Sequence, residues 1–413
     1  MASIFKVTDL IAQESLRIAH EKLQMISTVD RQYDKDFAFN GRGSPHGATL
    51  RVKDPNQYTR RTGNAMAVQA QNESTQTLTV ATLDGVDMDF SMQELIQSVD
   101  NDGKFDSLSK NYIVPAISSL VSAIEADAIA FWTKATWNVA GTAGTPLTDL
   151  VAVGAARSKL NQGATPKDGN RFIQADSPTM AGMVNGLKGL FQDSAQIKSQ
   201  YSEGMMGRTA MADWYENDRM WTLPNSADVL GSINGGTLTS GITSLTVNNL
   251  TVAPVAGMVF TIGAGGGQTP VYAVHPETKQ NLGFLQQFVC SAGCTTTNLV
   301  FTPAIIFDTT NAKQNVSGAP TTTADITFVG GASTNYAQSL MYHKDAFQFI
   351  TAPLPILDDA HKCVMVEKDG LSLRCWMGSD IVNNALRMRI DILYGFGALR
   401  PAFASRIIGA ASS

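Results

Sequence analysis

One stretch of the sequence constrains the fold more than any other. Between Gly231 and Gly331 only five residues carry a charge, and Thr, Gly, Asn and Val dominate. Short strand patterns recur there between Gly- and Asn-rich turns, over residues 245–251, 258–262, 271–274, 284–290, 299–302 and 326–329. Evenly spaced short strands of this kind are typical of a β-barrel or a β-sandwich. We therefore predict an all-β domain over residues 229–332.

The sequence on either side of this domain mixes helix and strand patterns. Ser177-Pro178 predicts the start of a helix, with Ser as the N-cap and Pro at the first helical position. Asp369-Gly370 is a strong hairpin turn between two strand patterns, and residues 386–394 alternate between apolar and mostly charged side chains, which predicts a strand with one polar face. An all-β stretch between mixed flanks indicates that one domain is inserted into another. The predicted fold class is therefore α+β with an inserted β-barrel.

The first third of the chain predicts an arm, a hairpin and a long helix. Residues 1–40 carry dense mixed charge and apolar side chains at near-helical spacing, which predicts an amphipathic helix or arm. Residues 41–82 begin Gly-rich, continue basic and end in a strand pattern, which predicts a long projecting β-hairpin. A helix is expected near residues 107–136, with Pro115 in its first turns or at a kink. The apolar stripe of this helix comprises Ile113, Ile117, Leu120, Ile124, Ala128 and Phe131.

Composition narrows the range of functions. A chain of 413 residues is long enough for two or three domains. Its net charge of −5 argues against a protein that binds nucleic acid by neutralising phosphates. Charged residues make up 16%, against about 25% in ordinary soluble proteins, so either much of the surface contacts other chains or the surface is rich in neutral polar residues. We find no apolar signal core and no stretch approaching 18 uncharged apolar residues, so we expect a soluble protein with no membrane partner.

The side chains that usually carry catalysis or bind metals form no convincing pattern. Cys290 and Cys294 lack a second cysteine or histidine pair to complete a zinc site, so we expect packed or loop cysteines. Asp358-Asp359-x-His361 is better explained as a solvated turn than as a metal site. The Gly263–Gly267 run lacks the Lys-Ser/Thr pair of a phosphate-binding loop. We therefore predict no enzyme activity, no catalytic residue, no cofactor and no metal.

The order of the predicted elements resembles the HK97-like capsid fold, and specifically the coat protein of phage P22 and its relatives. The segments that are similar to this family are Val274–Lys279, Gly283–Phe288, Leu299–Pro303, Phe347–Pro355, Leu393–Gly395 and Leu399–Pro401. The resemblance implies an N-terminal arm at 1–40, an E-loop hairpin at 41–82, a P-domain with its spine helix at 83–138, an A-domain with returning P-domain strands at 139–228 and 333–413, and the inserted barrel at 229–332.

The resemblance also implies a function. A protein of this family would be the major capsid protein that self-assembles into the icosahedral head of a tailed bacteriophage around double-stranded DNA. Its implied partners are copies of itself in pentamers and hexamers, a scaffolding protein, a portal and, at the inner wall, packaged DNA bound without sequence specificity. Its implied location is the virion capsid, assembled in the cytoplasm of a bacterial host. Another phage structural, tail or adhesion protein is the alternative, but it leaves the long helix and the basic hairpin unexplained.

The sequence departs from the family in two places. Asn234–Thr243 is neutral, whereas relatives hold neighbouring subunits together across two-fold axes through a long charged loop in the insertion. Contacts of that kind are therefore not predicted. Lys53 is the lysine of the hairpin, and no partner for a covalent cross-link can be named for it, so no cross-linking is predicted either.

Basic side chains on exposed elements are the candidate contacts between subunits. They are Arg42, Arg51, Lys53, Arg60, Arg61, Arg387, Arg389 and Arg400. Arg60 and Arg61 are expected near the tip of the 41–82 hairpin. Exposed ion pairs contribute only about 0–1 kcal/mol to a monomer, so two adjacent arginines there have little use within one subunit. We expect both to act between subunits.

Overall fold

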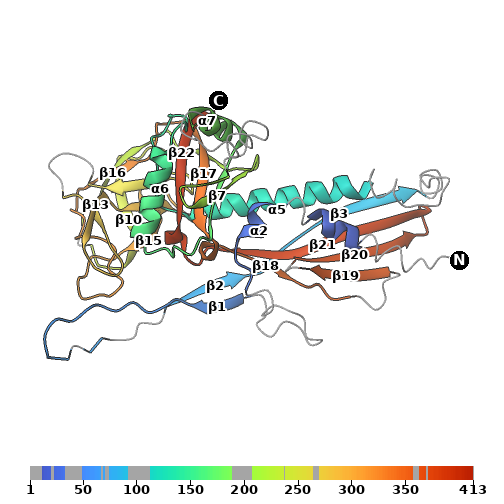
Figure 1. Ribbon diagram of the computed structural model, residues 1–413, viewed down its shortest axis with the longest axis horizontal. Coiled ribbons are helices and arrows are strands. Elements are labelled where there is room, and N and C mark those ends of the chain that lie inside the picture. Colours follow the sequence, from blue (N-terminus) through green and yellow to red (C-terminus); the bar gives the residue numbers. More distant parts are fainter. Residues whose placement is uncertain are drawn as a thin grey trace. The chain divides into compact units, whose positions relative to one another are not determined.

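The computed structural model describes residues 12–19, 23–32, 49–66, 68–69, 74–91, 112–187, 207–236, 238–263, 269–356, 362–368 and 371–412. They fall into two compact units (Figure 1). Unit 1 comprises residues 1–53, 75–128 and 347–397, and unit 2 comprises residues 54–74, 129–346 and 398–413. Several residues of the sequence predictions lie outside the described residues, namely Arg42, Ala264–Gly267, Asp358, Asp359, His361, Asp369 and Gly370.

Unit 1 is built on a five-stranded antiparallel sheet. Its strands are β18 (Gln348–Ala352), β21 (Ala385–Gly397), β20 (Leu371–Asp380) and β19 (Lys362–Lys368), paired in that order, with β3 (Thr82–Ser91) also pairing with β21. Lys368 lies opposite Leu371, so β19 and β20 form the hairpin predicted around Asp369-Gly370. Met388, Ile390 and Ile392 of β21 are buried, as the alternation in the sequence predicts.

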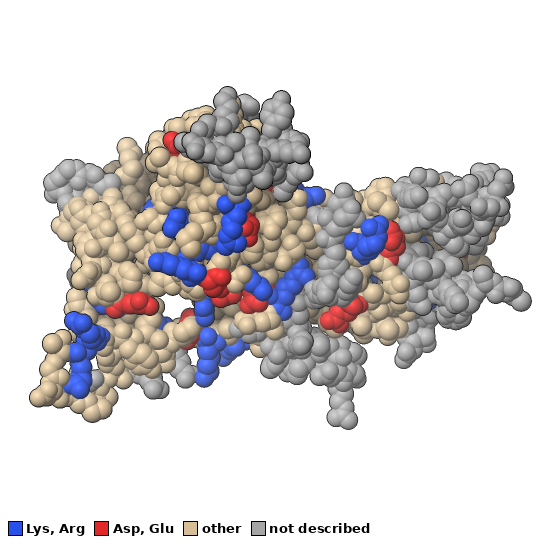
Figure 2. Space-filling model, in the orientation of Figure 1, with Lys and Arg blue, Asp and Glu red and all other residues tan. Residues whose placement is uncertain are grey.

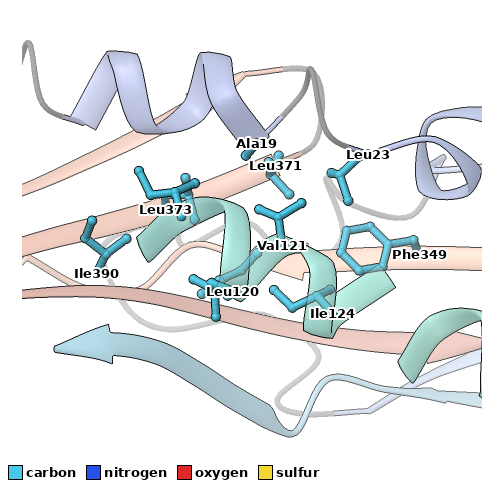
Figure 3. Close-up of a pocket in the computed structure, with 11 residues that line it drawn as sticks. Ala19, Leu23, Leu120, Val121, Ile124, Phe349, Leu371, Leu373 and Ile390 are labelled. Atoms are coloured by element: carbon cyan, nitrogen blue, oxygen red, sulfur yellow. The ribbon is translucent and has the colours of Figure 1, made fainter. Parts of the chain in front are cut away.

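Helix α5 (Val114–Ala135) confirms the predicted long helix, with Pro115 in its first turn. Its apolar stripe packs on the sheet of unit 1. Leu120, Val121 and Ile124 of α5 converge with Leu373 and Ile390 of the sheet around an apolar cavity of about 10 Å³ (Figure 3). By length and composition α5 could also cross a membrane, with a mean hydropathy of 1.5, but a buried core helix passes the same test.

One position of the predicted stripe is wrong. Phe131 is 44% exposed, whereas its neighbour Trp132 is fully buried together with Ile129. The division between the two units falls after Ala128, so the last two turns of α5 pack in a different core from the turns before them. Successive residues of a helix point about 100° apart, and a new core therefore selects a new face.

The arm segment next to α5 is anchored by a buried carboxylate. Glu125 of α5 is fully buried and accepts the backbone N–H groups of Gln24 and Met25 at 3.0 and 2.7 Å. These are the residues at the start of the short helix α2 (Met25–Thr28). Further along, Asp30 forms a parallel bridge to Gln348 of β18, whose Nε2 donates to Asp30 Oδ2 at 2.8 Å. The arm segment is thus tied to both the helix and the sheet of unit 1.

Unit 2 contains a closed six-stranded barrel. The strands are β9 (Leu230–Ile233), β10 (Ile242–Asn248), β11 (Val259–Ile262), β14 (Gln287–Cys290), β15 (Asn298–Ile305) and β16 (Asp325–Phe328). They pair in the closed order β10-β15-β14-β11-β16-β9. β12 (Tyr272–Val274) and β13 (Asn281–Leu285) form a separate two-stranded ribbon. It contains the predicted 271–274 strand and the first residues of the predicted 284–290 strand. β9 was not predicted, because Leu-Gly-Ser-Ile is short and contains a glycine.

The second layer of unit 2 is a seven-stranded mixed sheet. Its strands are β4 (Val139–Ala140), β22 (Ala404–Ser412), β17 (Asn335–His343), β5 (Arg171–Ala175), β7 (Ala212–Glu216) and β6 (Arg208–Thr209), with β8 (Thr222–Pro224) also paired to β17. Helices α6 (Leu150–Gln162) and α7 (Ser177–Leu187) contribute buried side chains such as Leu160 and Met183 to its core. The apolar core of the barrel also includes Val139, Leu223, Tyr336 and Ile408 of this sheet.

The predicted cap of α7 is displaced by one residue. Ser177 is the first helical residue, so Asp176 takes the N-cap position, and its carbonyl accepts the Met180 N–H at 2.9 Å. The Ser177 hydroxyl contacts the carboxylates of Glu216 and Asp218. These carboxylates come from strand β7 and the turn after it, which no local pattern around Ser177 could reveal.

Candidate assembly surface

The predicted hairpin is present, with a shorter ladder than its sequence range. β1 (Thr49–Lys53) and β2 (Thr75–Thr79) pair antiparallel, with Lys53 opposite Thr75. One more rung follows, in which the Asp54 N–H donates to the Ser74 carbonyl at 2.9 Å. The Ser74 hydroxyl also donates to Asp54 Oδ2 at 2.8 Å. We name the described residues from 54 to 74 the finger.

Side chains replace the ladder toward the end of the finger. Gln69 accepts the Thr59 N–H at 2.8 Å and donates to the Thr59 carbonyl at 2.6 Å, so its amide group takes the place of an opposite backbone. At the tip, Arg61 Nη1 donates to the carbonyls of Gly63 and Ala65 at 2.5 and 2.8 Å. The finger is therefore braced by its own side chains rather than by regular pairing.

The outer end of the finger presents apolar and basic groups to solvent. Tyr58, Met66 and Val68 are 56, 83 and 81% exposed, and Arg60 is exposed as well. Lys and Arg side chains gather in Figure 2 where this end lies in Figure 1. An exposed apolar group beside a cation is typical of a contact with another protein. The role predicted for Arg60 between subunits stays a prediction, and the Arg61 guanidinium donates to two carbonyls of the finger itself.

Arg389, one of the predicted contacts between subunits, forms ion pairs within its own subunit on the sheet of unit 1. Arg389 Nε lies 2.5 Å from Asp391 Oδ1, and this contact raises the pKa of the arginine. Asp391 is completely buried and also accepts from Arg374 Nη2 at 2.7 Å. The exposed Asp87 of β3 lies 3.7 Å from Arg389. Asp391 was expected on the polar face of its strand, but two arginines cover it.

The register of β3 explains how a carboxylate can be buried there. Asp391 lies opposite Gly85, and a Cβ at Gly85 would come within 2.7 Å of both Asp391 Oδ1 and the Ile390 carbonyl. Glycine is therefore required for this close approach. Neither the buried ion pair nor the need for Gly85 is visible in the sequence, because both depend on which residues face each other across strands.

The other basic candidates are distributed over separate elements. Arg387 Nη2 lies 2.9 Å from Asp380 Oδ2, and Arg51 and Lys53 are on the exposed positions of β1. The Arg400 guanidinium stacks 5.6 Å from the ring of Phe403, in unit 2. The seven candidates among the described residues therefore come from separate elements of the two units. Arg60 and Arg61 are both exposed and lie on the finger with the exposed Tyr58, Met66 and Val68.

Two cations that were not predicted from the sequence, the half-buried Lys159 and the buried Arg406, join the barrel to the rest of unit 2. Lys159 of α6 donates to the Val139 carbonyl and to Gln287 Oε1 at 2.5 and 2.7 Å, and burial lowers its pKa to about 8. Arg406 of β22 is completely buried, and its Nη1 donates to the Gly257 carbonyl at 2.7 Å. Burial also lowers the pKa of Arg406. Both cations bond neutral oxygens, so no ion-pair pattern in the sequence could have identified them.

The cysteines of the barrel are free thiols. Cys290 is buried at the end of β14, and Cys294 is half-buried in the turn that follows. Their mutual hydrogen bond raises the pKa of Cys290 and lowers that of Cys294 to about 7. Cys294 Sγ donates to the Val300 carbonyl at 3.2 Å, so it is engaged with the neighbouring strand. Within the described ranges, no group of three or more His, Cys, Asp or Glu side chains could hold a metal ion.

Residues 242–409 match the family model described as P22 coat protein, gene protein 5. The match begins in β10 of the barrel and ends in β22, so it includes most of the barrel and the strands of the sheet of unit 1 that follow it in sequence. The chain is a tailed-phage major capsid protein. This confirms the predicted relationship and the predicted role in forming the phage head.

Comparison with solved structures gives similar chains at low sequence identity. A chain described as Mycobacterium phage Che8 is 10% identical, with a TM-score of 0.46 over 92% of this chain and 89% of that one. The capsid of the cyanophage P-SCSP1u is 11% identical, with a TM-score of 0.43 over 89% and 84%. The capsid of an empty GTA particle is 10% identical, with a TM-score of 0.44 over 94% and 92%. No curated protein matches the chain.

Proposed function

We propose that this capsid protein has the HK97-like fold with an inserted barrel, divided as its sequence suggests. The arm would be residues 1–40, the E-loop 41–82, the P-domain 83–138, the A-domain with returning P-domain strands 139–228 and 333–413, and the insertion 229–332. In support, α5 packs on a long-stranded sheet in unit 1, and the β1–β2 hairpin precedes both. The six barrel strands all lie between Leu230 and Phe328, within the proposed insertion.

The proposed assembly is an icosahedral shell of pentamers and hexamers that encloses double-stranded DNA. Scaffolding protein and portal are its proposed partners during assembly in the host cytoplasm, and packaged DNA would meet the inner wall without sequence specificity. We also propose that the chain has no catalytic activity. Copies of one weak contact can close a stable shell, because symmetry repeats the contact at every subunit.

The observation that carries the proposed mode of assembly is the finger. Its side chains hold it in one conformation before it meets a partner, and its outer end exposes Tyr58, Met66 and Val68 beside Arg60. A braced element loses less conformational freedom on binding, which favours association. We propose that this end contacts a neighbouring subunit.

Electron microscopy of the purified chain tests the proposal. Shells or partial shells are the expected result, and fibres would instead support a tail or adhesion protein. Arg60→Glu should weaken assembly by reversing the charge at the contact, while the free subunit melts as before. Arg61→Glu should also weaken assembly, but through the finger itself, with faster amide hydrogen exchange at Gly63 and Ala65. Normal shell yield in the Arg60 variant would contradict the proposed contact.

The matched control for these two variants is Lys167→Glu. Lys167 is exposed in unit 2, in the connection between α6 and β5, and the charge change is the same. Its assembly should be normal. Assembly of the native chain should also weaken as salt is raised, since screening shortens the range of attractions between exposed charges.

A further inference from the structure

Within unit 2, the base of the finger contacts the loop that follows β15. Lys313 Nζ donates to the Ser74 hydroxyl at 2.5 Å, and that hydroxyl donates in turn to Asp54 Oδ2 at 2.8 Å. All three side chains are half-buried. A cation of the barrel loop is therefore connected through one hydroxyl to an anion of the finger. Hydrogen bonds that involve charged groups are the stronger ones in proteins.

The loop on the barrel side is itself fixed. We name residues 308–316 the cradle. Lys279 Nζ donates to the Ala312 carbonyl, and Asn311 Oδ1 accepts the Lys313 N–H at 2.9 Å. Asn315 donates from Nδ2 to the Ala304 carbonyl of β15 at 2.7 Å. The cradle is thus held to the barrel by contacts that do not involve the finger.

A hollow of about 190 Å³ separates the finger from the cradle next to this contact. Most of the groups that line it are polar, and they come from both sides: Asn56, Gln57, Val68 and Gln69 of the finger, and Thr310, Asn311, Ala312 and Lys313 of the cradle. The finger therefore does not rest on the barrel through apolar burial here. The Lys313–Ser74–Asp54 connection sets its direction, and the space beside it has room for several water molecules.

We propose that the cradle positions the finger in the free subunit. The inserted barrel would thereby set the direction of the finger end that contacts a neighbouring subunit. The inference rests on the proposed function, because the direction of the finger matters only if the finger binds a neighbour. An isolated two-stranded ribbon is marginally stable in water, and this finger has only partial pairing beyond Asp54. A support that fixes its direction lowers the entropy lost on assembly.

Lys313→Met tests the cradle in the free subunit, since Met has a similar length and no donor. Hydrogen exchange of the Asp54 and Thr59 amides should become several-fold faster. Lys313→Arg, which keeps the charge and the donor, should stay close to the native chain. Lys167→Met removes an exposed lysine elsewhere in unit 2 and should have no effect. Unchanged exchange in Lys313→Met would show that the cradle does not hold the finger.

Assembly of the same variants tests the role of the cradle. The subunit concentration needed for shells should rise several-fold in Lys313→Met, and Lys313→Arg should restore most of the difference. Faster exchange together with normal assembly would overturn the positioning role. If the native chain forms no shells, the proposed function itself fails, and the exchange experiment still decides whether the cradle holds the finger.

Discussion

The barrel of unit 2 and the sheet of unit 1 are both antiparallel, but the barrel strands carry few charged side chains and the sheet strands carry many. In the barrel, Phe260 packs against Phe288, Phe301 and Phe328 with ring centroids 5.6 Å apart in each pair. The exposed positions of β10 are Thr, Ser and Asn. The barrel is closed and has no strand edge that must be kept from pairing with another chain.

The sheet of unit 1 is open, and its strands carry charged side chains at positions of the kind that hold neutral polar side chains in the barrel. β3 carries Asp84, Asp87 and Asp89, and its neighbour β21 carries Arg387 and Arg389. Charged side chains on an edge strand discourage pairing with other sheets. The low charge of residues 231–331 is therefore explained by barrel closure and a neutral polar surface. It does not require that the barrel be covered by other chains.

Among the variants that test this difference, Asp391→Ala should lower the free energy of unfolding most. It removes the buried partner of Arg374, whose side chain is only 11% exposed, and leaves that cation uncompensated. Breaking a buried ion pair from one side costs about 3–5 kcal/mol. Urea unfolding that follows the signal of unit 1 measures the loss. A loss below about 1 kcal/mol would mean that the sheet does not depend on its buried charges.

The next prediction concerns the pH dependence of stability. It follows from Lys159 of α6, which donates to Gln287 of the barrel. Burial lowers the pKa of Lys159 to about 8 from 10.5, so between these values the unfolded chain binds a proton that the folded chain does not. Stability relative to Lys159→Met should therefore be flat below pH 8 and rise by about 1–3 kcal/mol toward pH 10.5. Parallel stability curves for the native chain and the variant would show that folding does not lower the pKa of Lys159.

Phe260→Leu tests the apolar side of the comparison. The Leu side chain leaves part of the space between three phenylalanine rings unfilled, so we expect a loss of about 1–2 kcal/mol in the free energy of unfolding of unit 2. Thr246→Ser, on an exposed position of β10, is a control that should change stability little. Equal effects of the two substitutions would show that the aromatic core does not dominate the barrel.

Asp89→Asn should have the smallest effect. Asp89 and Arg387 are 3.9 Å apart, and each side chain is 58% exposed, so water already solvates both charges. The loss should stay within about 0.5 kcal/mol. Together with Asp391→Ala, this variant separates charge at the surface of the sheet from charge inside it. A loss as large as that of Asp391→Ala would mean that burial does not distinguish the two pairs.

Local patterns in the sequence determined much of this fold. The period-2 alternation of residues 386–394 and the four-residue spacing from Leu120 to Ile124 each reflect a geometry that repeats along one element, so they can be detected without knowing the partner. The position of Arg60 and Arg61 near the end of the hairpin also followed from the sequence, because the paired strands on each side fix the middle of the loop between them.

Only the tertiary structure decided how the polar side chains are used. Arg61 bonds the carbonyls of its own loop, Asp391 is buried between Arg374 and Arg389, and Lys313 meets Ser74 from 239 positions away in the sequence. The Arg61 contacts depend on the backbone path of one loop, and the other two depend on the register between strands or on contacts between distant segments. Apolar burial is nondirectional and leaves a periodic record in the sequence, whereas a hydrogen bond needs one particular partner at one distance and leaves none.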